Sequence, residues 1–504
     1  MTTADQTAVL DFLGQAATHG GARVQRIDTH AASVFLAGER ALKVKRAVIF
    51  PFLDYSTLAK REAACRAELD VNRPFAPQIY KRVVPITRAS DGSLAIGGQG
   101  APVEWAVEMH RFDETQTLDH LADAGKLDDA LADALGRAAA QAHERAPAAA
   151  PGPWIKSLAR IIDQNDAELR SSPSLFGRDD VRALTAASHA ALTTLHALLS
   201  ERGRLGLIRR CHGDLHLGNI VLIGGEPVLF DAIEFDPLIA TGDVLYDLAF
   251  LLMDLIERGL TGAATIVLNR YLTETRRDED LDALALLPLF MSVRAAIRAK
   301  VTAARQGDDV TRLARDYFTL ALRLIAPPPP RLVAVGGLSG TGKSVLARAL
   351  APFVPPLPGA VVLRSDVERK LLFGAAETER LPPNAYEPDM TASVYARLAG
   401  KARRALAAGH SVIVDAVYAA PAEREAIAAT ARSLRVPFTG LFLTAGLETR
   451  LARVGRRTGD ASDADVAVAR RQDAYDLGTL DWIGIDASGT PGDTRARARA
   501  ALGS

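Results

Sequence analysis

The alternation of apolar and polar residues predicts a β-rich segment near the start of the chain. Residues 5–18 have the spacing of an amphipathic helix, and residues 23–28 have the alternation of a strand. Two more short strand patterns, Ser33–Leu36 and Ala41–Lys45, flank the four residues Ala37–Arg40, which include a glycine. Because a short glycine-containing connection between two strand patterns favours a hairpin, we expect these strands to pair.

Helical patterns become more frequent further along the chain. A helix is predicted over residues 56–73, with Ser56 or Thr57 as its N-cap, and two strands follow at Val83–Ile86 and Val103–Met109. Longer helices are then predicted over residues 126–145, 155–171, 178–202 and 310–325. The first part of the chain is therefore expected to be an α+β domain.

Four consecutive prolines, Pro327–Pro330, mark the clearest boundary in the sequence. A proline run cannot continue a helix, and it favours a stiff extended spacer. We therefore predict one domain over residues 1–326, a linker over residues 327–330 and a second domain over residues 331–504.

Apolar strands that end in carboxylates characterise the second domain. Leu332–Val335 predicts a buried strand, and Val361–Asp366 and Ser411–Asp415 predict two more, each ending in an aspartate. Active sites of parallel α/β sheets lie at the carboxyl ends of such strands. The pattern therefore predicts an α/β domain with a parallel sheet, and it places Asp366 and Asp415 near its active site.

Composition narrows the class of protein without pointing to a macromolecular partner. The length of 504 residues suggests roughly two to four domains, and the contents of 48% apolar and 24% charged residues are ordinary for a globular protein. Lys and Arg together number 60, as do Asp and Glu. Because these charges balance, no global field favours nucleic acid or an anionic membrane.

The sequence also carries expectations about location. Cys65 and Cys211 fit no metal-site spacing, and so few cysteines agree with a reducing compartment. The first residues lack a basic region that leads into an apolar core, and no run approaches about 18 apolar residues, so we expect neither a signal peptide nor a membrane span. We predict a cytoplasmic protein with no membrane partner, and the oligomeric state stays open.

The most informative stretch is Arg209–Ile220, which reads Arg-Arg-Cys-His-Gly-Asp-Leu-His-Leu-Gly-Asn-Ile and precedes the apolar-to-acidic run Val228–Asp231. Phosphoryl transfer requires a carboxylate beside the attacking hydroxyl and oxygen ligands for Mg²⁺ at the ATP phosphates. Asp214, Asn219 and Asp231 supply these groups in the order that kinases use, and the five-residue step from Asp214 to Asn219 is that of the kinase catalytic loop. We predict Asp214 as the general base and the other two residues as magnesium ligands.

This stretch resembles the aminoglycoside phosphotransferase family, over residues 25–260 of the chain. The resemblance implies an α+β bilobal protein-kinase-like domain that binds ATP. It aligns Lys45 with the lysine that holds the ATP phosphates, although Lys43 remains an alternative because residues two apart share one face of a strand. It also implies that Glu68, rather than Glu62, is the ATP-site carboxylate that orients this lysine.

The second half contains a complete phosphate-binding motif. Residues 337–344 satisfy G-x-x-x-x-G-K-[ST] between a predicted strand and a predicted helix. Backbone N–H groups in such a loop surround phosphate, the lysine meets the β- and γ-phosphates, and the serine holds magnesium. The predicted ATP-binding residues are Gly337, Ser339, Gly340, Thr341, Gly342, Lys343 and Ser344, of which Ser344 is also a magnesium ligand.

This P-loop NTPase domain resembles small P-loop kinases such as gluconate kinase, zeta-toxin-like proteins and polynucleotide 5′-kinases. The resemblance implies that Asp366 is catalytic, that Arg369 binds the acceptor and that Asp415 is a magnesium ligand. A later arginine-rich helix resembles the lid of these kinases, in which arginine neutralises charge on the transferred phosphoryl group. Arg453 and Arg457 lie four residues apart on that helix, and we expect both to contact ATP.

The combined prediction is a bifunctional phosphotransferase that depends on ATP and Mg²⁺. Each domain would transfer the γ-phosphoryl group to a hydroxyl of a small molecule. Two alternatives stay open: the second domain phosphorylates nucleic-acid ends, or one domain senses nucleotide and regulates the other. The lack of a strongly basic or aromatic-interleaved stretch argues against nucleic acid. Neither acceptor, nor the choice between ATP and GTP, can be deduced from the sequence.

Overall fold

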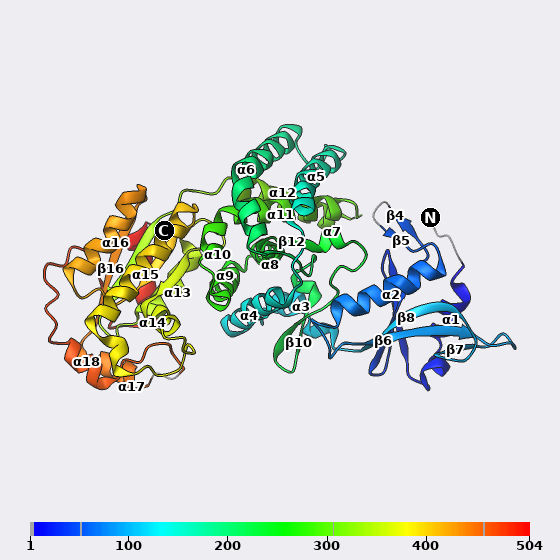
Figure 1. Ribbon diagram of the computed structural model, residues 1–504, viewed down its shortest axis with the longest axis horizontal. Coiled ribbons are helices and arrows are strands. Elements are labelled where there is room, and N and C mark those ends of the chain that lie inside the picture. Colours follow the sequence, from blue (N-terminus) through cyan, green and yellow to red (C-terminus); the bar gives the residue numbers. More distant parts are fainter. Residues whose placement is uncertain (1–4, 51–52, 306, 457–458, 504) are drawn as a thin grey trace. The chain divides into compact units, whose positions relative to one another are not determined.

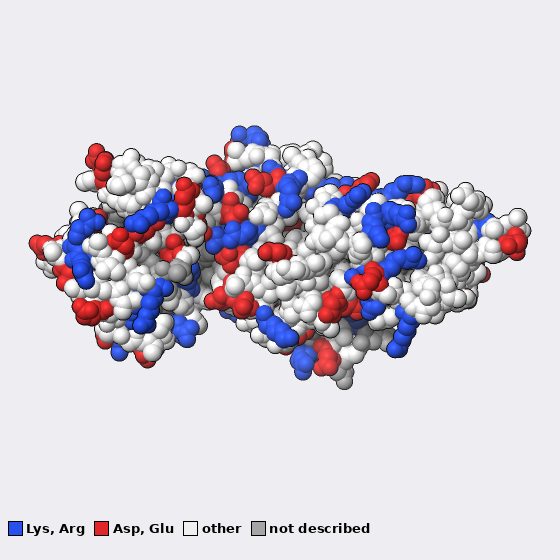
Figure 2. Space-filling model, turned by 90° about the horizontal axis from the view of Figure 1, so that it is seen from below, with Lys and Arg blue, Asp and Glu red and all other residues white. Residues whose placement is uncertain are grey.

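The computed structural model describes residues 5–50, 53–305, 307–456 and 459–503, and the chain forms two compact units (Figure 1). Unit 1 comprises Met1–Ile161 and His196–Asp254, and unit 2 comprises Ile162–Leu195 and Leu255–Ser504. Among the described residues, no helix is both long enough and apolar enough to cross a membrane. On the face drawn in Figure 2, basic and acidic side chains are intermingled, as expected from the balanced composition.

Unit 1 contains a six-stranded antiparallel sheet in the order β1-β2-β3-β8-β6-β7. Its strands are β1 (Val24–Asp28), β2 (Ala32–Ala37), β3 (Arg40–Lys45), β6 (Tyr80–Arg88), β7 (Leu94–Ile96) and β8 (Ala101–His110). The predicted hairpin is confirmed, since β2 and β3 pair with Val34 opposite Lys43. Strand β7 was not predicted, because three residues are too few to show a periodicity.

Two helices pack on opposite faces of strand β3. Helix α1 (Thr7–Gly14) packs with Leu42 and Val44, whereas helix α2 (Leu58–Asn72) packs on the side of Ala41. Because successive side chains of a strand point to opposite faces, Lys43 and Lys45 lie on the same side as Ala41 and point toward α2. Helix α2 begins after Thr57, whose side chain accepts a hydrogen bond from the Lys60 N–H at 3.3 Å.

The rest of unit 1 consists of helices and three short two-stranded sheets. The short strands are β4 (Ile49–Phe50), β5 (Leu53–Asp54), β9 (Ile208–Arg210), β10 (Ile220–Ile223), β11 (Glu226–Leu229) and β12 (Thr241–Asp243). Besides α1 and α2, the α-helices that lie wholly or partly in the described part of this unit are α3 (Leu118–Asp123), α4 (Asp129–Arg145), α5 (Pro151–Arg170), α6 (Arg178–Arg204), α7 (Pro237–Ala240) and α8 (Val244–Glu257). The pairs β9–β12 and β10–β11 flank the predicted catalytic loop.

Unit 2 contains a five-stranded parallel sheet in the order β14-β15-β13-β16-β17, which confirms the predicted parallel α/β fold. Its strands are β13 (Leu332–Gly337), β14 (Val361–Arg364), β15 (Val412–Asp415), β16 (Phe438–Thr444) and β17 (Ile483–Asp486). The helices that follow the strands are α13 (Lys343–Leu350), α14 (Ser365–Leu372), α15 (Pro388–Ala407), α16 (Pro421–Leu434), α17 (Leu447–Gly455), α18 (Val466–Gln472) and α19 (Pro491–Leu502).

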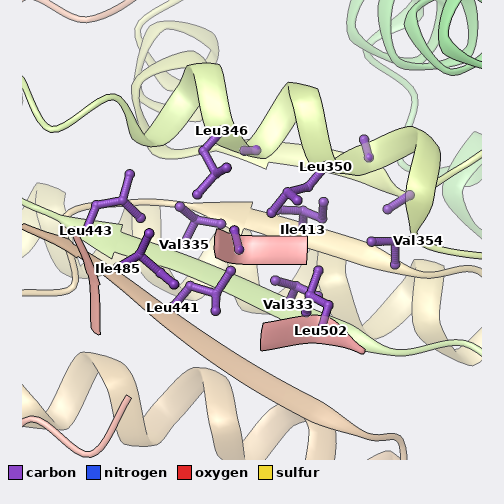
Figure 3. Packing of buried hydrophobic residues seen from close by; sticks show 14 of the residues in the cluster. Val333, Val335, Leu346, Leu350, Val354, Ile413, Leu441, Leu443, Ile485 and Leu502 are labelled. Atoms are coloured by element: carbon purple, nitrogen blue, oxygen red, sulfur yellow. The ribbon is translucent and has the colours of Figure 1, made fainter. Parts of the chain in front are cut away.

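A cluster of buried apolar side chains packs against this sheet. Val333 and Val335 of β13 and Leu441 of β16 pack against Leu346 of α13 and Leu502 of α19 (Figure 3). Each of these side chains is buried, and burying a side chain of this size contributes about 1.5–3 kcal/mol. This core fixes the strand β13 from which the phosphate-binding loop leaves the sheet.

Unit 2 also includes helices that precede the proline run. Those that lie wholly in the unit are α9 (Thr261–Thr275), α10 (Glu279–Asp282), α11 (Leu287–Ala303) and α12 (Asp308–Ile325). Helix α9 contacts β14, the edge strand of the parallel sheet: Asn269 accepts from the Val362 N–H at 2.7 Å and donates to the Ala360 carbonyl at 3.1 Å. One amide side chain thus satisfies two backbone groups of an otherwise open strand edge.

Candidate active sites

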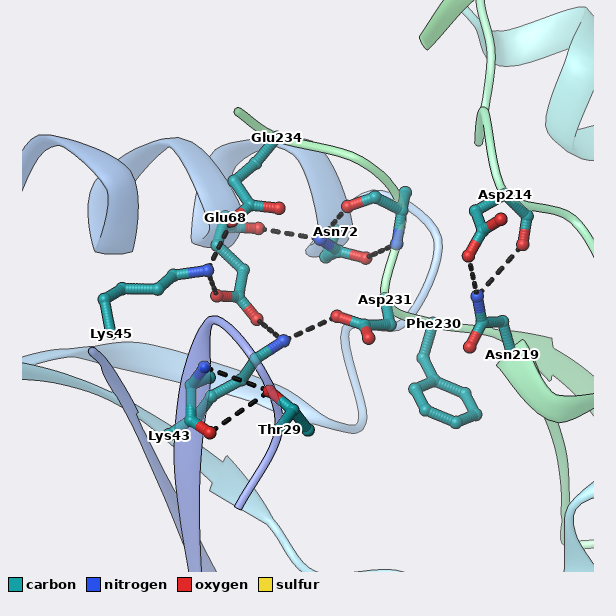
Figure 4. A network of polar contacts seen from close by, with 12 residues as sticks. Thr29, Lys43, Lys45, Glu68, Asn72, Asp214, Asn219, Phe230, Asp231 and Glu234 are labelled. Atoms are coloured by element: carbon teal, nitrogen blue, oxygen red, sulfur yellow. Dashed lines mark hydrogen bonds and ion pairs between the residues drawn. The ribbon is translucent and has the colours of Figure 1, made fainter. Parts of the chain in front are cut away.

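Two lysines of β3 meet one carboxylate of α2. Glu68 Oε1 lies 2.8 Å from Lys43 Nζ, and Glu68 Oε2 lies 2.6 Å from Lys45 Nζ (Figure 4). Burial alone would raise the pKa of Glu68, but the two ammonium groups outweigh it and hold that pKa below its usual value. The predicted carboxylate is thus in place, and it holds both of the candidate lysines.

The two lysines differ in their second partners. Lys45 pairs with Glu234, lies 5.5 Å from the centre of the Tyr55 ring, and has a side chain only 4% exposed. Lys43 pairs with Asp231 at 2.6 Å, and the exposed fractions of these two side chains are 15% and 44%. Burial lowers the pKa of Lys43, but Asp231 and Glu68 reverse this and raise it well above its usual value, so Lys43 stays charged.

The backbone at Asp231 adopts a left-handed conformation with φ of 61°. A short polar side chain tolerates this region better than most residues. The Asp231 N–H donates to the Tyr80 hydroxyl at 3.1 Å. The next residue, Ala232, is held by Asn72, which accepts from its N–H at 2.7 Å and donates to its carbonyl at 3.1 Å (Figure 4). Asn72 and Tyr80 were missed by the sequence reasoning, because a supporting contact of this kind leaves no local pattern.

Asp214 and Asn219 lie together in the predicted catalytic loop. The Asn219 Nδ2 donates to the backbone carbonyl of Asp214 and to its carboxylate, both at 3.0 Å (Figure 4). This arrangement orients the Asn219 amide so that its oxygen points away from Asp214. That oxygen can therefore accept a hydrogen bond or bind a metal ion. Asn219, Asp214 and Asp231 each offer an oxygen atom, which is the type of ligand that Mg²⁺ prefers.

Asp247 of helix α8 supports the loop that carries Asp214. Its carboxylate accepts from the His212 N–H at 3.3 Å and from the Gly213 N–H at 2.8 Å. His212 Nε2 in turn donates to the Phe230 carbonyl at 2.8 Å, next to Asp231. Burial lowers the pKa of His212, so the ring is neutral at neutral pH. Through these bonds the loop and the segment of Asp231 are fixed to each other.

The structure also brings together three potential metal ligands that the sequence spacing did not indicate. The ligand atoms of His143, Cys211 and Asp247 lie within 4.8 Å of one another, and all three residues are buried. His143 Nε2 is already 3.0 Å from Asp247, and both oxygens of that carboxylate accept from the catalytic loop. These contacts are those of a buried polar support for the loop.

The phosphate-binding loop in unit 2 is shaped by its glycines. Gly337, Gly340 and Gly342 have positive φ values of 140°, 85° and 93°, which L-residues with side chains rarely adopt. A Cβ at Gly340 would lie 2.5 Å from the Arg450 carbonyl oxygen, whereas one at Gly342 would meet nothing within 4 Å. The Ser339 N–H donates to Gln472 Oε1 at 2.6 Å.

The two aspartates predicted at strand ends lie in different settings. Asp415 ends β15, is buried, lies 3.4 Å from Arg364 Nε and accepts a hydrogen bond from Ser344. Burial raises its pKa, although Arg364 and Lys343 oppose this. Asp366 lies in the first turn of α14, because β14 ends at Arg364 and the chain turns directly into this helix. The prediction that β14 extends to Asp366 was therefore wrong.

A cavity of about 1640 Å³ lies over the phosphate-binding loop. The predicted site residues that line it are Ser339, Gly340, Thr341, Gly342, Lys343, Ser344, Asp366, Arg369 and Arg453. Gly337 and Asp415 lie outside this lining, and Asp415 reaches the loop through Ser344 instead. Arg453 of α17 donates to the Gly489 carbonyl at 2.9 Å. Arg457 lies outside the described residues.

Each half of the chain contains a segment that matches a known protein family. Residues 27–287 match the Phosphotransferase enzyme family, and residues 332–475 match a family described as AAA domain. An uncharacterised protein of Mycobacterium tuberculosis is 31% identical over 466 residues, which cover 90% of this chain and 90% of that protein.

Two solved structures are similar to parts of the chain. An aminoglycoside phosphotransferase from Alicyclobacillus acidocaldarius is 14% identical and covers 60% of this chain and 89% of its own, with a TM-score of 0.36. A sugar kinase from Janibacter is 23% identical and covers 35% of this chain and 95% of its own, with a TM-score of 0.28.

Proposed function

The chain belongs to the phosphotransferase enzyme family, and we propose that it carries two active sites, each of which transfers the γ-phosphoryl group of ATP to a hydroxyl of a small molecule. The observation that carries this proposal is that each unit holds candidate groups in contact or around one cavity: Lys43 with Asp231 and Asn219 with Asp214 in unit 1, and Lys343, Ser344 and Asp366 in unit 2. When bound, Mg²⁺ neutralises charge on the ATP phosphates.

In unit 1, Asp214 is the proposed base, and Asn219 and Asp231 are the proposed magnesium ligands. The acceptor hydroxyl gives its proton to the Asp214 carboxylate, and its oxygen forms a bond to the γ-phosphorus. The bond between that phosphorus and the oxygen bridging to the β-phosphate breaks, so ADP leaves and a phosphate ester remains. The contact of Asn219 with Asp214 supports this assignment, because it holds base and metal ligand in one loop.

The geometry favours Lys43, rather than the Lys45 preferred from the sequence, as the phosphate ligand of unit 1. Lys43 contacts Asp231, the proposed magnesium ligand. The Lys43 side chain is also more exposed than that of Lys45, at 15% against 4%. Lys45 is enclosed between Glu68 and Glu234. We assign Lys45 to holding Glu68 in position, and Glu68 in turn orients Lys43.

In unit 2, Lys343 and the loop N–H groups are the proposed phosphate ligands. Asp366 is the proposed base, because it lines the same cavity as the loop. Ser344 and Asp415 are the proposed magnesium pair, since they contact each other and offer two oxygens beside Lys343. Arg453 lines the cavity and is proposed to meet the phosphates.

The test is the number of nucleotide sites in the full chain. Calorimetry with Mg²⁺ and the non-hydrolysable analogue AMPPNP should give two sites per chain for the wild type. Lys343→Ala should lose the site of unit 2 and keep that of unit 1. Asp231→Ala should lose the site of unit 1 and keep that of unit 2, and the double variant should bind no AMPPNP. A single site in the wild type that disappears in Lys343→Ala would contradict a working site in unit 1.

A further inference from the structure

A buried glutamine at the start of helix α1 contacts the strand that carries the two lysines of unit 1. Gln6 Nε2 donates to the Lys45 carbonyl at 2.9 Å and to Glu104 Oε2 at 2.7 Å. Gln6 Oε1 accepts from the Ala47 N–H at 2.7 Å. One side-chain amide therefore holds the backbone at the end of β3 and joins it to β8, the strand that carries Glu104.

The same carboxylate also holds helix α2. Glu104 is fully buried, and both of its oxygens lie 2.9 Å from Arg61 Nε. Arg61 Nη1 also donates to the Tyr55 carbonyl at 3.1 Å. Arg61 precedes Glu68 by seven residues, or about two turns of α2, so the two side chains lie on one face of that helix. Gln6 and Glu104 therefore connect β3 with α2, the two elements whose lysines and carboxylate form the ion pairs of the unit 1 site.

Helix capping does not explain the glutamine. Gln6 occupies the N-cap position of α1, where Asn, Asp, Ser and Thr are preferred because their side chains accept from the first N–H groups of the helix. Within the described part of the chain, the Gln6 side chain makes no such bond. It points into unit 1 instead, and the residue is only 8% exposed. Since a buried amide is costly unless its polar atoms are paired, the contacts with β3 and β8 account for this residue.

We propose that Gln6 is a positioning residue of the unit 1 site, which directs Lys43 toward the ATP phosphates by aligning β3 with α2. This inference rests on the proposed phosphotransferase function of unit 1. Because Lys45 follows Lys43 by two residues on the same strand, a shift of the Lys45 backbone would move both ammonium groups relative to Glu68. Gln6 precedes residues 27–287, the part of the chain that matches the Phosphotransferase enzyme family, so α1 adds a support from outside that match.

The experiment uses the full chain with Lys343→Ala, so that AMPPNP and Mg²⁺ bind only to the proposed site of unit 1, and calorimetry gives the affinity. Gln6→Met keeps the length of the side chain but removes its three hydrogen bonds, and it should weaken AMPPNP binding by roughly 10-fold. The loss should depend on the lysine. In a chain that also carries Lys43→Met, Gln6→Met should change the affinity by less than about 2-fold, because the group that it positions is absent.

Two further variants separate positioning from stability, with urea unfolding to establish that each variant is folded during the titration. Thr18→Ala is the matched control, because it removes the hydrogen bond of 2.6 Å from the Thr18 hydroxyl to the Phe12 carbonyl at the other end of α1. It should change AMPPNP affinity by less than about 2-fold.

The other variant, Glu104→Gln, is milder than Gln6→Met and carries the test if Gln6→Met does not fold. Its amide oxygen can still accept from Arg61, but its NH₂ group offers no acceptor to Gln6 Nε2. The link to β3 is therefore weakened while the link to α2 is kept, and AMPPNP affinity should lie between those of the parent chain and Gln6→Met.

Three results would overturn the inference: affinity that is unchanged in Gln6→Met and Glu104→Gln, an equal loss in Gln6→Met and Thr18→Ala, or the same loss from Gln6→Met with and without Lys43→Met. The last two would reduce Gln6 to a residue that only stabilises the fold. A Lys343→Ala chain with Gln6 in place that binds no AMPPNP would instead contradict the proposed site of unit 1 itself.

Discussion

The two proposed phosphate sites are held in shape by different parts of the chain. In unit 1, long side chains from β3, α2 and the Asp231 segment fix one another through buried ion pairs. In unit 2, the backbone conformation determines the shape of the site, because the loop between β13 and α13 contains glycines with positive φ. The first site therefore depends on charge, and the second depends on the absence of a side chain.

This difference decides which substitutions each site tolerates. Removing one member of a buried ion pair leaves a charge without its partner, which is far more costly than losing an exposed pair. Adding a methyl group to a left-handed glycine costs backbone strain even where space is open, and more where another backbone lies close. The variants below therefore remove charged groups from the site of unit 1 and add side-chain atoms to glycines in the site of unit 2.

The largest effect is expected at the enclosed lysine of unit 1. Lys45→Met leaves Glu234 and one oxygen of the buried Glu68 without their cation, so the free energy of unfolding should fall by about 3–5 kcal/mol. Lys43→Met is the matched comparison, because Glu68 keeps Lys45 and Asp231 remains partly exposed. It should lose less stability but weaken AMPPNP binding in unit 1 by roughly 10-fold.

Urea unfolding and calorimetry on both variants separate these two roles. If Lys43→Met were the less stable variant and Lys45→Met lost nucleotide with its fold intact, Lys45 would be the phosphate ligand after all.

The second largest effect is expected at the glycines of unit 2. Gly340→Ala should weaken AMPPNP binding in unit 2 by about 100-fold, because its Cβ would lie 2.5 Å from the Arg450 carbonyl oxygen and φ is 85°. Gly342→Ala meets nothing within 4 Å and should lose only about 10-fold through strain at φ of 93°. Unit 1 binding should not change in either variant. Equal losses at the two glycines would show that space at Gly340 is not limiting.

The same difference explains how much of each site the sequence could predict. The P-loop is contiguous, so a local motif could predict that Lys343 and Ser344 lie between a buried strand and a helix, as they do between β13 and α13. The candidate catalytic loop of unit 1 could be proposed for the same reason, because Asp214 and Asn219 are only five residues apart, and in the structure the two residues touch.

Contacts between distant segments could not be predicted in this way. Lys43 and Lys45 are equivalent on a strand, and only their partners Asp231 and Glu234, which come from another part of the chain, distinguish them. The pair of Lys370 in α14 with Asp463 was missed because an acidic segment and a basic one give no sign of which partners meet. The parallel α/β fold was predicted correctly from three buried apolar strands, because such strands are a local property, whereas β16 and β17 were not predicted.

A pH effect of intermediate size is expected in unit 2. His410 is buried, its Nε2 donates to the Gly359 carbonyl at 2.8 Å, and burial lowers its pKa to about 4. An unfolded histidine has a pKa near 6.5 and so takes up a proton first. The stability that depends on neutral His410 is therefore complete above about pH 6.5 and is lost as the pH falls toward 4, by about 2–3 kcal/mol at pH 4.5.

His410→Gln retains a donor for the Gly359 carbonyl but cannot titrate. The difference in unfolding free energy between wild type and this variant should therefore shrink or reverse between pH 7.5 and pH 4.5. A constant difference for His410→Gln would mean that the buried ring does not remain neutral in the fold.

The smallest effect tests how far the second site extends along the chain. Asn269 of α9 lies before the proline run, yet it bonds to Ala360 and Val362 of β14, the strand that leads to Arg364 and Asp366. Asn269→Ala should lower the stability of unit 2 by about 1–2 kcal/mol, because two backbone groups lose their partner. Thr273→Ala removes a hydroxyl from the same helix that bonds only within it, and should cost less.

AMPPNP affinity in unit 2 is the decisive measurement for Asn269→Ala. A loss of stability with weaker nucleotide binding would mean that α9 positions the strand leading to Asp366. The second catalytic unit would then begin before α9 and not at Pro327–Pro330, so a backbone-built site would still depend on one side chain from the preceding helices. Unchanged stability and affinity would instead support residues 331–504 as a module complete in itself.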